Sequence, residues 1–278
     1  MVTNRAASAC AEAALLNSDG VFIVNSYEKK PVLEVKGVSK KFGAIQALKD
    51  VDFEVFYGEV VGLVGDNGAG KSTLIKVISG VHNPDSGQIF YQGKRVTITS
   101  PRVSTDLGIA TVYQDLALCD NLDVVANLFV GREISKKTFP GLKNLYWLDE
   151  TAMEKRALDL LERLNVPIPS VRRVVATMSG GQRQSVAVTR AVMENCSLVM
   201  LDEPTAALGV EQTERVMKLI QKLKSGNDMG VIVISHNMQD IFEITDRIIV
   251  LRLGKRVATF ETKSARPDQV VAAITGAK

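Results

Sequence analysis

Residues 65–72 are the sequence feature that most constrains this chain, and they read Gly-Asp-Asn-Gly-Ala-Gly-Lys-Ser. They fit the pattern G-x-x-x-x-G-K-[ST] of a phosphate-binding loop. The apolar run 59–64 before them suits a buried parallel strand, and residues 73–78 after them have room to form a helix. A strand, a glycine-rich turn and a helix in this order aim free backbone N–H groups at an anion. The segment therefore predicts a nucleoside triphosphate site, and the flanking elements disfavour the alternative of an ordinary glycine-rich turn.

Two side chains at the end of this loop have expected partners in a bound nucleotide. Lys71 is expected to reach the β- and γ-phosphates, and the Ser72 hydroxyl is expected to ligate Mg²⁺. The glycines of the loop allow the backbone to approach a phosphate closely.

Composition and charge disfavour several classes of protein. Of the 278 residues, 46% are hydrophobic and 23% charged, which is ordinary for a globular protein, and the net charge of +3 is too small to indicate nucleic-acid binding. Cys10, Cys119 and Cys196 are scattered, so neither a metal site nor a disulfide framework is indicated and a reducing cytoplasm is expected. No apolar run approaches the ~18–20 residues of a membrane span. The chain could still dock on a protein that spans a membrane.

The first part of the chain predicts an extension followed by antiparallel strands. Residues 1–30 are expected to be a loosely ordered extension without a signal peptide, and residues 31–278 the folded domain. Period-two alternation within 31–55 predicts half-buried antiparallel strands, and a further hairpin is expected at 88–98. The alternation assigns one face of the first strand to Val32, Glu34 and Lys36, and the other face to Leu33, Val35 and Gly37.

The rest of the chain alternates apolar runs with segments of helical periodicity. Residues 115–178 are expected to be mostly helical, with a capping box at 151–154 and a break at 139–141. An apolar stripe at helical spacing in this region consists of Met153, Ala157, Leu160, Leu161 and Leu164. Further strands are expected at 109–113, 198–201, 230–234 and 248–251, a turn at 253–255, and helices at 211–223 and 267–274.

Polar side chains follow two of the expected buried strands, where open α/β sheets bind their ligands. Asp202 and Glu203 end the strand 198–201 and point in opposite directions, because side chains alternate along a strand. One carboxylate can hold Mg²⁺ while the other addresses an attacking water. His236 follows the strand 230–234, and its position favours a functional role over a structural one.

Two further candidate binding sites, residues 179–182 and Phe42, also have purely structural explanations. Ser179 and Gln182 form a capping box around Gly180 and Gly181, which weaken a first helical turn by about 1 kcal/mol each relative to alanine. These glycines suit the close approach of a ligand phosphate, whereas the alternative is simply a well-made helix start. Phe42, which lies between strands, could stack on a base, although a core or turn role is the more common one for such a residue.

The chain resembles the ATP-binding subunit of ATP-binding cassette (ABC) transporters over about residues 32–255. The most specific motif, residues 178–182, reads Met-Ser-Gly-Gly-Gln and is similar to the family signature Leu-Ser-Gly-Gly-Gln. The resemblance implies an α/β P-loop NTPase cassette with a mixed or parallel sheet core. It also implies an N-terminal antiparallel β-subdomain and an α-helical subdomain at about 115–178.

The resemblance assigns roles to individual residues. Phe42 matches the aromatic residue that stacks on adenine, and Ser179, Gly180 and Gly181 match residues that bind the γ-phosphate of ATP held by another subunit. The nucleotide-binding residues implied are Phe42, Gly65, Asp66, Asn67, Gly68, Ala69, Gly70, Lys71, Ser72, Thr73, Ser179, Gly180, Gly181 and Gln182.

The catalytic and metal-binding roles follow in the same way. Glu203 matches the base that polarises the attacking water, His236 the switch histidine that contacts the γ-phosphate, and Asp202 the carboxylate that holds Mg²⁺ through water. Gln114 matches the glutamine that touches Mg²⁺ or the water and senses the membrane partner. The catalytic set implied is Glu203, His236, Lys71 and Gln114, and the metal set is Ser72, Gln114 and Asp202.

Two positions depart from the family pattern. Met178 replaces leucine, a change that conserves volume. Gly209 replaces the usual aspartate of the motif Ser-Ala-Leu-Asp, which puts the coupling between two nucleotide sites in doubt.

The finer resemblance, at 112–118 and 204–210, is to importers of fructose, ribose or xylose. It implies a dimer that sandwiches ATP, a peripheral location on the cytoplasmic face of the membrane, permease subunits as partners and a sugar-binding protein outside the membrane. No nucleic-acid partner is expected. The alternatives are a soluble cassette protein that acts on the ribosome or DNA, and a regulatory cassette without catalysis, which only Gly209 suggests.

Overall fold

The computed structural model describes residues 15–16, 22–23, 30–137, 146–193, 196–226 and 228–277. The chain divides into two compact units, Met1–Lys30 and Pro31–Lys278. In the first unit, β1 (Leu15–Leu16) pairs antiparallel with β2 (Phe22–Ile23). Most of the residues expected to form the loose extension lie outside the described ranges.

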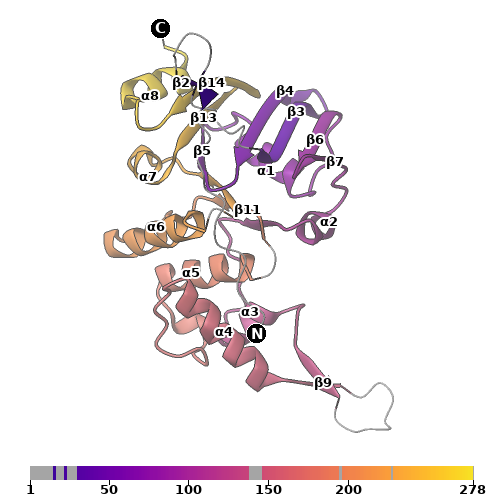
Figure 1. Cartoon of the computed structure of the whole chain (residues 1–278), viewed down its shortest axis with the longest axis vertical. Coiled ribbons are helices and arrows are strands. Elements are labelled where there is room, and N and C mark those ends of the chain that lie inside the picture. The colour runs from indigo at the N-terminus through magenta and orange to yellow at the C-terminus, as the bar shows by residue number, and fades with distance from the viewer. Residues whose placement is uncertain are drawn as a thin grey trace. The chain divides into compact units, whose positions relative to one another are not determined.

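A six-stranded mixed sheet forms the centre of the second unit (Figure 1). In spatial order its strands are β14 (Lys255–Glu261), β13 (Arg247–Arg252), β5 (Val60–Val64), β12 (Gly230–Ile234), β11 (Leu198–Asp202) and β8 (Ile109–Val112). The five strands from β13 to β8 are parallel, and only β14 at the edge runs antiparallel. All the strands expected from the apolar runs are present, whereas β14 was not expected because its half-buried face consists of Arg256, Ala258 and Phe260 and gives no apolar alternation in the sequence.

A four-stranded antiparallel sheet packs beside the central sheet. Its spatial order is β4 (Ile45–Phe56), β3 (Pro31–Phe42), β6 (Ser86–Tyr91) and β7 (Lys94–Val96). The sequence places Val32 on the face of Glu34, and this assignment is wrong because the β3–β4 register shifts between Pro31 and Leu33. Val32 and Leu33 are consequently both fully buried.

Helices cover the sheets, and α3, α4 and α5 gather at one end of Figure 1. Their bounds are α1 (Lys71–Ile78), α2 (Pro101–Asp106), α3 (Val124–Phe129), α4 (Glu150–Arg163), α5 (Gly180–Ala191), α6 (Val210–Lys224), α7 (Met238–Ile244) and α8 (Pro267–Thr275), with a short 3₁₀ turn at Val175–Thr177. In the described parts of the chain, no helix combines the length and the apolar character that crossing a bilayer requires.

Two expectations for the region 115–178 need correction. Besides helices it contains a hairpin of β9 (Ser135–Lys137) and β10 (Tyr146–Leu148), and the expected break at 139–141 lies outside the described residues. Helix α4 is capped by Asp149, whose side chain accepts a hydrogen bond from the Ala152 N–H, and not by Thr151. Aspartate is a better N-cap than threonine, so the helix begins two residues earlier than the capping-box pattern indicated.

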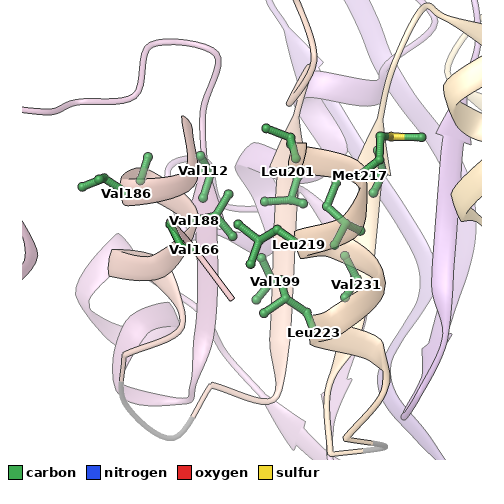
Figure 2. Close-up of a cluster of buried hydrophobic side chains, with 14 of the residues drawn as sticks. Val112, Val166, Val186, Val188, Val199, Leu201, Met217, Leu219, Leu223 and Val231 are labelled. Carbon is green, nitrogen blue, oxygen red and sulfur yellow. The ribbon is translucent and has the colours of Figure 1, made fainter. Parts of the chain in front are cut away.

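Every residue of β5 is buried because the central sheet is covered on both faces. Val60 and Val64 pack into one hydrophobic cluster, which includes side chains from α5, α6 and α7. Val61 and Leu63 face a second cluster, which includes α1 and the antiparallel sheet. In the first cluster, Figure 2 shows Leu219 and Leu223 of α6 beside Val199 of β11.

A group of buried charges joins the two sheets. The guanidinium of Arg247, at the start of β13, donates to Glu54 Oε1 at 2.9 Å and to Glu59 Oε1 at 2.6 Å. Arg256 of β14 donates to the other oxygen of Glu54 at 2.7 Å. The side chain of Arg247 is only 11% exposed and that of Glu59 only 9%, so the loss of Arg247 would leave the Glu59 carboxylate buried without a charged partner, whereas Glu54 would keep Arg256.

Arg247→Met is therefore expected to lower the free energy of unfolding by about 3 kcal/mol or more. Arg215→Met is the matched control, since Arg215 pairs with Glu211 on the exposed side of α6 and should cost less than about 1 kcal/mol. Urea unfolding monitored by circular dichroism measures both values. Equal losses in the two variants would contradict a structural role for the buried group.

Candidate functional site

The loop that joins β5 to α1 has the backbone of a phosphate cradle. Gly70 precedes α1 with a φ of 106°, in the left-handed region that favours glycine. At Gly65 a Cβ atom would lie 2.2 Å from the carbonyl oxygen of Leu251, so no other residue fits. The Lys71 side chain is buried, and its Nζ donates to the carbonyl oxygens of Gly65 at 2.8 Å and Asp66 at 3.1 Å.

The turn between β13 and β14 supports this cradle from outside. The Gly254 N–H donates to the carbonyl oxygen of Ala69 in the loop at 3.0 Å, and the Gly254 carbonyl accepts from the Lys49 N–H of β4 at 2.8 Å. The turn thus ties the loop to the antiparallel sheet. The sequence identified 253–255 only as a turn, because a backbone contact between distant segments leaves no side-chain signature.

The two carboxylates lie where the parallel strands end. Asp202 is the last residue of β11 and pairs with Ile234, so Glu203 and His236 follow neighbouring strands at one sheet edge. The His236 Nε2 lies 3.3 Å from Glu203 Oε1, and the His236 N–H lies 3.4 Å from Glu203 Oε2. Glu203 adopts a φ of 52°, a left-handed conformation that costs a non-glycine residue about 1 kcal/mol or more. The polar residues that the sequence placed after these two strands therefore lie at the same edge of the sheet.

Burial shifts the ionisation of three neighbouring groups. It raises the pKa of Glu203, against the opposing charge of His236, and it raises the pKa of Asp202, against the opposing charge of Lys71. Burial also lowers the pKa of Lys71, although Glu203, Asp202 and Asp66 oppose that change. Lys71 and the two carboxylates thus oppose part of the burial cost of each other's charge, although Asp202 also raises the pKa of Glu203, and the three groups form one electrostatic unit.

Gln114 and Phe42 lie at the margins of this region. Gln114 is exposed and lies two residues after the end of β8, the neighbour of β11. Phe42 pairs with Ile45 at the end of the β3–β4 hairpin and is 42% exposed, so it is not a core residue. Its ring meets that of His82 edge to face, with centroids 5.0 Å apart, and the Lys40 ammonium lies over the ring at 5.6 Å from its centroid.

The signature segment caps α5 as expected. The Ser179 hydroxyl oxygen accepts a hydrogen bond from the Gln182 N–H, and Gln182 Oε1 accepts one from the Ser179 N–H, which confirms the capping box. The structure also shows why a glycine is required at position 181. A Cβ atom on Gly181 would lie 2.8 Å from the Gln212 Cβ of α6, and the Gly181 N–H donates to Gln212 Oε1. Close helix packing therefore accounts for Gly181 without any ligand.

A single chain does not bring the signature to the phosphate loop. Helix α5 lies with α3 and α4, on the other side of α6 from α1 and β5 (Figure 1). Among the described residues, no hydrogen bond or ion pair joins 179–182 to 65–72.

Together, the glycine cradle, the buried lysine and the carboxylates at the ends of parallel strands define a P-loop nucleotide-binding protein. The family model described as "ABC transporter" matches residues 48–206. The chain therefore belongs to the ABC transporter family, as its ATP-binding subunit.

Curated relatives include the fructose import ATP-binding protein FrcA of Rhizobium meliloti, which is 43% identical over 90% of this chain and 96% of its own length. The xylose/arabinose import ATP-binding protein XylG of Sulfolobus acidocaldarius is 42% identical over 88% of this chain and 94% of its own length. The ribose import ATP-binding protein RbsA 1 of Burkholderia cenocepacia is 38% identical, and the match spans 90% of this chain but 48% of that relative.

Solved structures show the same fold. The ADP conformation of MJ1267, an ATP-binding cassette of an ABC transporter, is similar with a TM-score of 0.74 at 25% identity, over 89% of this chain and 96% of that one. The dimeric structure of MJ0796, a bacterial ABC transporter cassette, has a TM-score of 0.68 at 25% identity, over 84% and 100%.

The raised pKa of Glu203 has a consequence for stability. A carboxyl group with a raised folded-state pKa destabilises the fold once it ionises, and the penalty disappears as the pH falls through that pKa. Glu203→Gln is therefore expected to stabilise the chain at pH 8 by on the order of 1 kcal/mol, with the gain shrinking towards pH 4. Glu214→Gln is the control, because its hydrogen bond to Lys218 lowers the pKa of Glu214 and no gain should follow. Urea unfolding at both pH values measures the difference, and a destabilised Glu203→Gln protein would contradict it.

The contact of Gly254 with the phosphate loop can be tested with a matched pair of turns. Gly93 and Gly254 occupy the same place in two hairpin turns, with φ of 76° and 74°. A Cβ atom on Gly93 would meet nothing within 4 Å, whereas one on Gly254 would lie 2.8 Å from the carbonyl oxygen of Ala47. Both alanine variants should lose about 1 kcal/mol of stability to the left-handed backbone, and Gly254→Ala should lose more because of this clash.

Only Gly254→Ala should also weaken ATP binding, by about tenfold, because it displaces the turn from Ala69. Isothermal titration with ATP compares the two variants below their unfolding temperatures. The same affinity in both would show that the turn does not support the loop.

Proposed function

We propose that this chain hydrolyses ATP to drive the import of a monosaccharide through a membrane permease. The observation that carries the proposal is the Glu203–His236 pair at the sheet edge, in one electrostatic unit with the buried Lys71. The names of the fructose and xylose/arabinose relatives support sugar import over action on the ribosome or DNA.

The chain's own residues divide the chemistry between them. The N–H groups of the loop and the Lys71 ammonium hold the β- and γ-phosphates, and Glu203 accepts a hydrogen bond from the attacking water and orients it for in-line attack on phosphorus. His236 donates to the γ-phosphate. The burial that raises the pKa of Glu203 also strengthens it as an acceptor for the water proton.

Mg²⁺ fits the donors available here. A hydroxyl at Ser72, an amide at Gln114 and a carboxylate at Asp202 are oxygen ligands, which this hard cation prefers. When bound, Mg²⁺ would neutralise charge that develops on the phosphates. Asp202, whose burial raises its pKa, would regain a compensating charge from the cation.

A second copy of the chain completes the site in this proposal. The Ser179 turn offers its helix N-terminus to an anion, but it lies in the other lobe from the phosphate loop (Figure 1). Two copies arranged head to tail would each present this turn to the nucleotide of the other. The dimeric cassette among the similar structures supports the arrangement. A peripheral location on the cytoplasmic face of the membrane and contact with permease subunits follow from the same proposal.

Gly209 does not remove the catalytic pair. It precedes α6 without a side-chain cap, and a Cβ atom there would meet nothing within 4 Å. An aspartate would fit at this position, so its absence affects contacts beyond the chain. We therefore favour a catalytic subunit over a regulatory one.

Lys71→Ala should weaken ATP binding at least tenfold, because it removes the ammonium group from the cradle. Lys76→Ala, on the exposed side of the same helix, is the control and should bind ATP normally. Glu203→Gln should bind ATP but lose on the order of 10² to 10³ in kcat. Fluorescent-nucleotide titration and phosphate release measure these effects. Normal turnover by Glu203→Gln would exclude it as the catalytic base.

The sugar can be identified by stimulation of this activity. The chain would be purified with its permease in lipid vesicles, and phosphate release measured with fructose, ribose, xylose and arabinose in the presence of the cognate sugar-binding protein. Stimulation by one of them is expected. A complex that none of these sugars stimulates would argue against monosaccharide import.

A further inference from the structure

A buried carboxylate outside the residues assigned so far connects the two catalytic loops. Asp240 lies in the first turn of α7 and is 6% exposed. Its Oδ2 accepts a hydrogen bond from Thr205 Oγ1 at 2.6 Å, and its Oδ1 accepts one from Asn237 Nδ2 at 2.9 Å. Each oxygen therefore holds a different loop.

Both donors are close in sequence to a proposed catalytic residue. Thr205 lies two residues after Glu203, and Asn237 directly follows His236. Asn237 is itself fixed, because its Oδ1 accepts from the Gln239 N–H at 3.0 Å. The link from Thr205 through Asp240 to Asn237 thus runs parallel to the direct contact between Glu203 and His236.

The loop after β11 needs such an anchor. Glu203 and Ala207 both adopt left-handed backbone conformations, with φ of 52° and 57°. Such residues cost about 1–3 kcal/mol each and persist only where the surroundings hold them. Thr205 lies between the two, and its side-chain bond to Asp240 fixes the loop to a helix.

We propose that Asp240 is a positioning residue that sets the placement of Glu203 relative to His236 for attack on the γ-phosphate. The proposal rests on the proposed ATPase function. Its physical basis is that a displacement of about 1 Å in a catalytic group can cost about 100-fold in rate. No sequence pattern indicates this role, because aspartate is common in the first turn of a helix.

The competing explanation is that Asp240 has only a structural role in its own helix. Asp240 could serve only the N-terminus of α7, whose dipole favours a negative charge. Thr205 separates the two explanations, because it belongs to the loop after β11 and contributes nothing to the cap of α7. Replacing it tests the link while Asp240 and the helix stay intact.

The experiment uses the full chain with Thr205→Val and Thr205→Ser as a matched pair. Valine keeps the shape and removes the hydroxyl, whereas serine keeps the hydroxyl. Thr205→Val is expected to lower kcat for ATP about tenfold or more, with KM within about threefold of wild type, and Thr205→Ser should stay within about threefold in both. Glu243→Gln, which removes an exposed charge from α7, should change neither. A Thr205→Val enzyme with wild-type kcat, or a Thr205→Ser enzyme equally impaired, would overturn the proposal.

A second measurement needs no turnover. The chain has two histidines, His82 and His236, so their ring signals are readily distinguished by NMR. Thr205→Val should shift the ring signals of His236 and leave those of His82 in place, whereas Thr205→Ser should shift neither. Unmoved His236 signals in Thr205→Val would refute the positioning role. An inactive wild-type chain would instead count against the ATPase, and the NMR comparison would still decide the role of Asp240.

Discussion

The burial of the Lys71 ammonium beneath the phosphate loop is the constraint on which the rest of the site depends. Two backbone carbonyls accept its hydrogen bonds, and Glu203, Asp202 and Asp66 oppose the cost of removing its charge from water. Asp202 and Glu203 are themselves buried enough that burial raises the pKa of each carboxyl group. A mutually dependent set of charges at a sheet edge is poor for stability and well suited to binding a phosphate chain.

The architecture brings these charges together through parallel strands. The β5, β11 and β12 strands are buried on both faces, so their ends are fixed by hydrophobic packing rather than by the polar groups they carry. The Arg247 group then ties the antiparallel sheet to the same core. The packed strands hold the loop after β11 in place. Glu203 can therefore keep its left-handed backbone conformation next to His236 while the protein stays folded.

Much of this could be predicted from local sequence because the main signals are local. The phosphate loop, the strand ends at Asp202 and His236 and the capping box at Ser179 are each contained in a few residues. Long-range contacts left no such signal. The bulge that buries Val32, the approach of Gly181 to Gln212, the support of Ala69 by Gly254 and the link through Asp240 all join segments far apart in the chain. The cap of α4 was misplaced for the opposite reason, since Asp149 and Thr151 offer competing local signals and the stronger N-cap, Asp149, begins the helix.

The division of the site between two lobes leads to the central claim, that one nucleotide is held by two copies of the chain. The most direct measurement is a crystal structure of the Glu203→Gln protein with ATP and Mg²⁺. The account predicts a dimer in which Lys71 has turned from the carbonyls of Gly65 and Asp66 to the phosphates, with the Ser179 turn of the second copy against the γ-phosphate. A nucleotide held by one copy alone, with the Ser179 turns facing solvent, would contradict it.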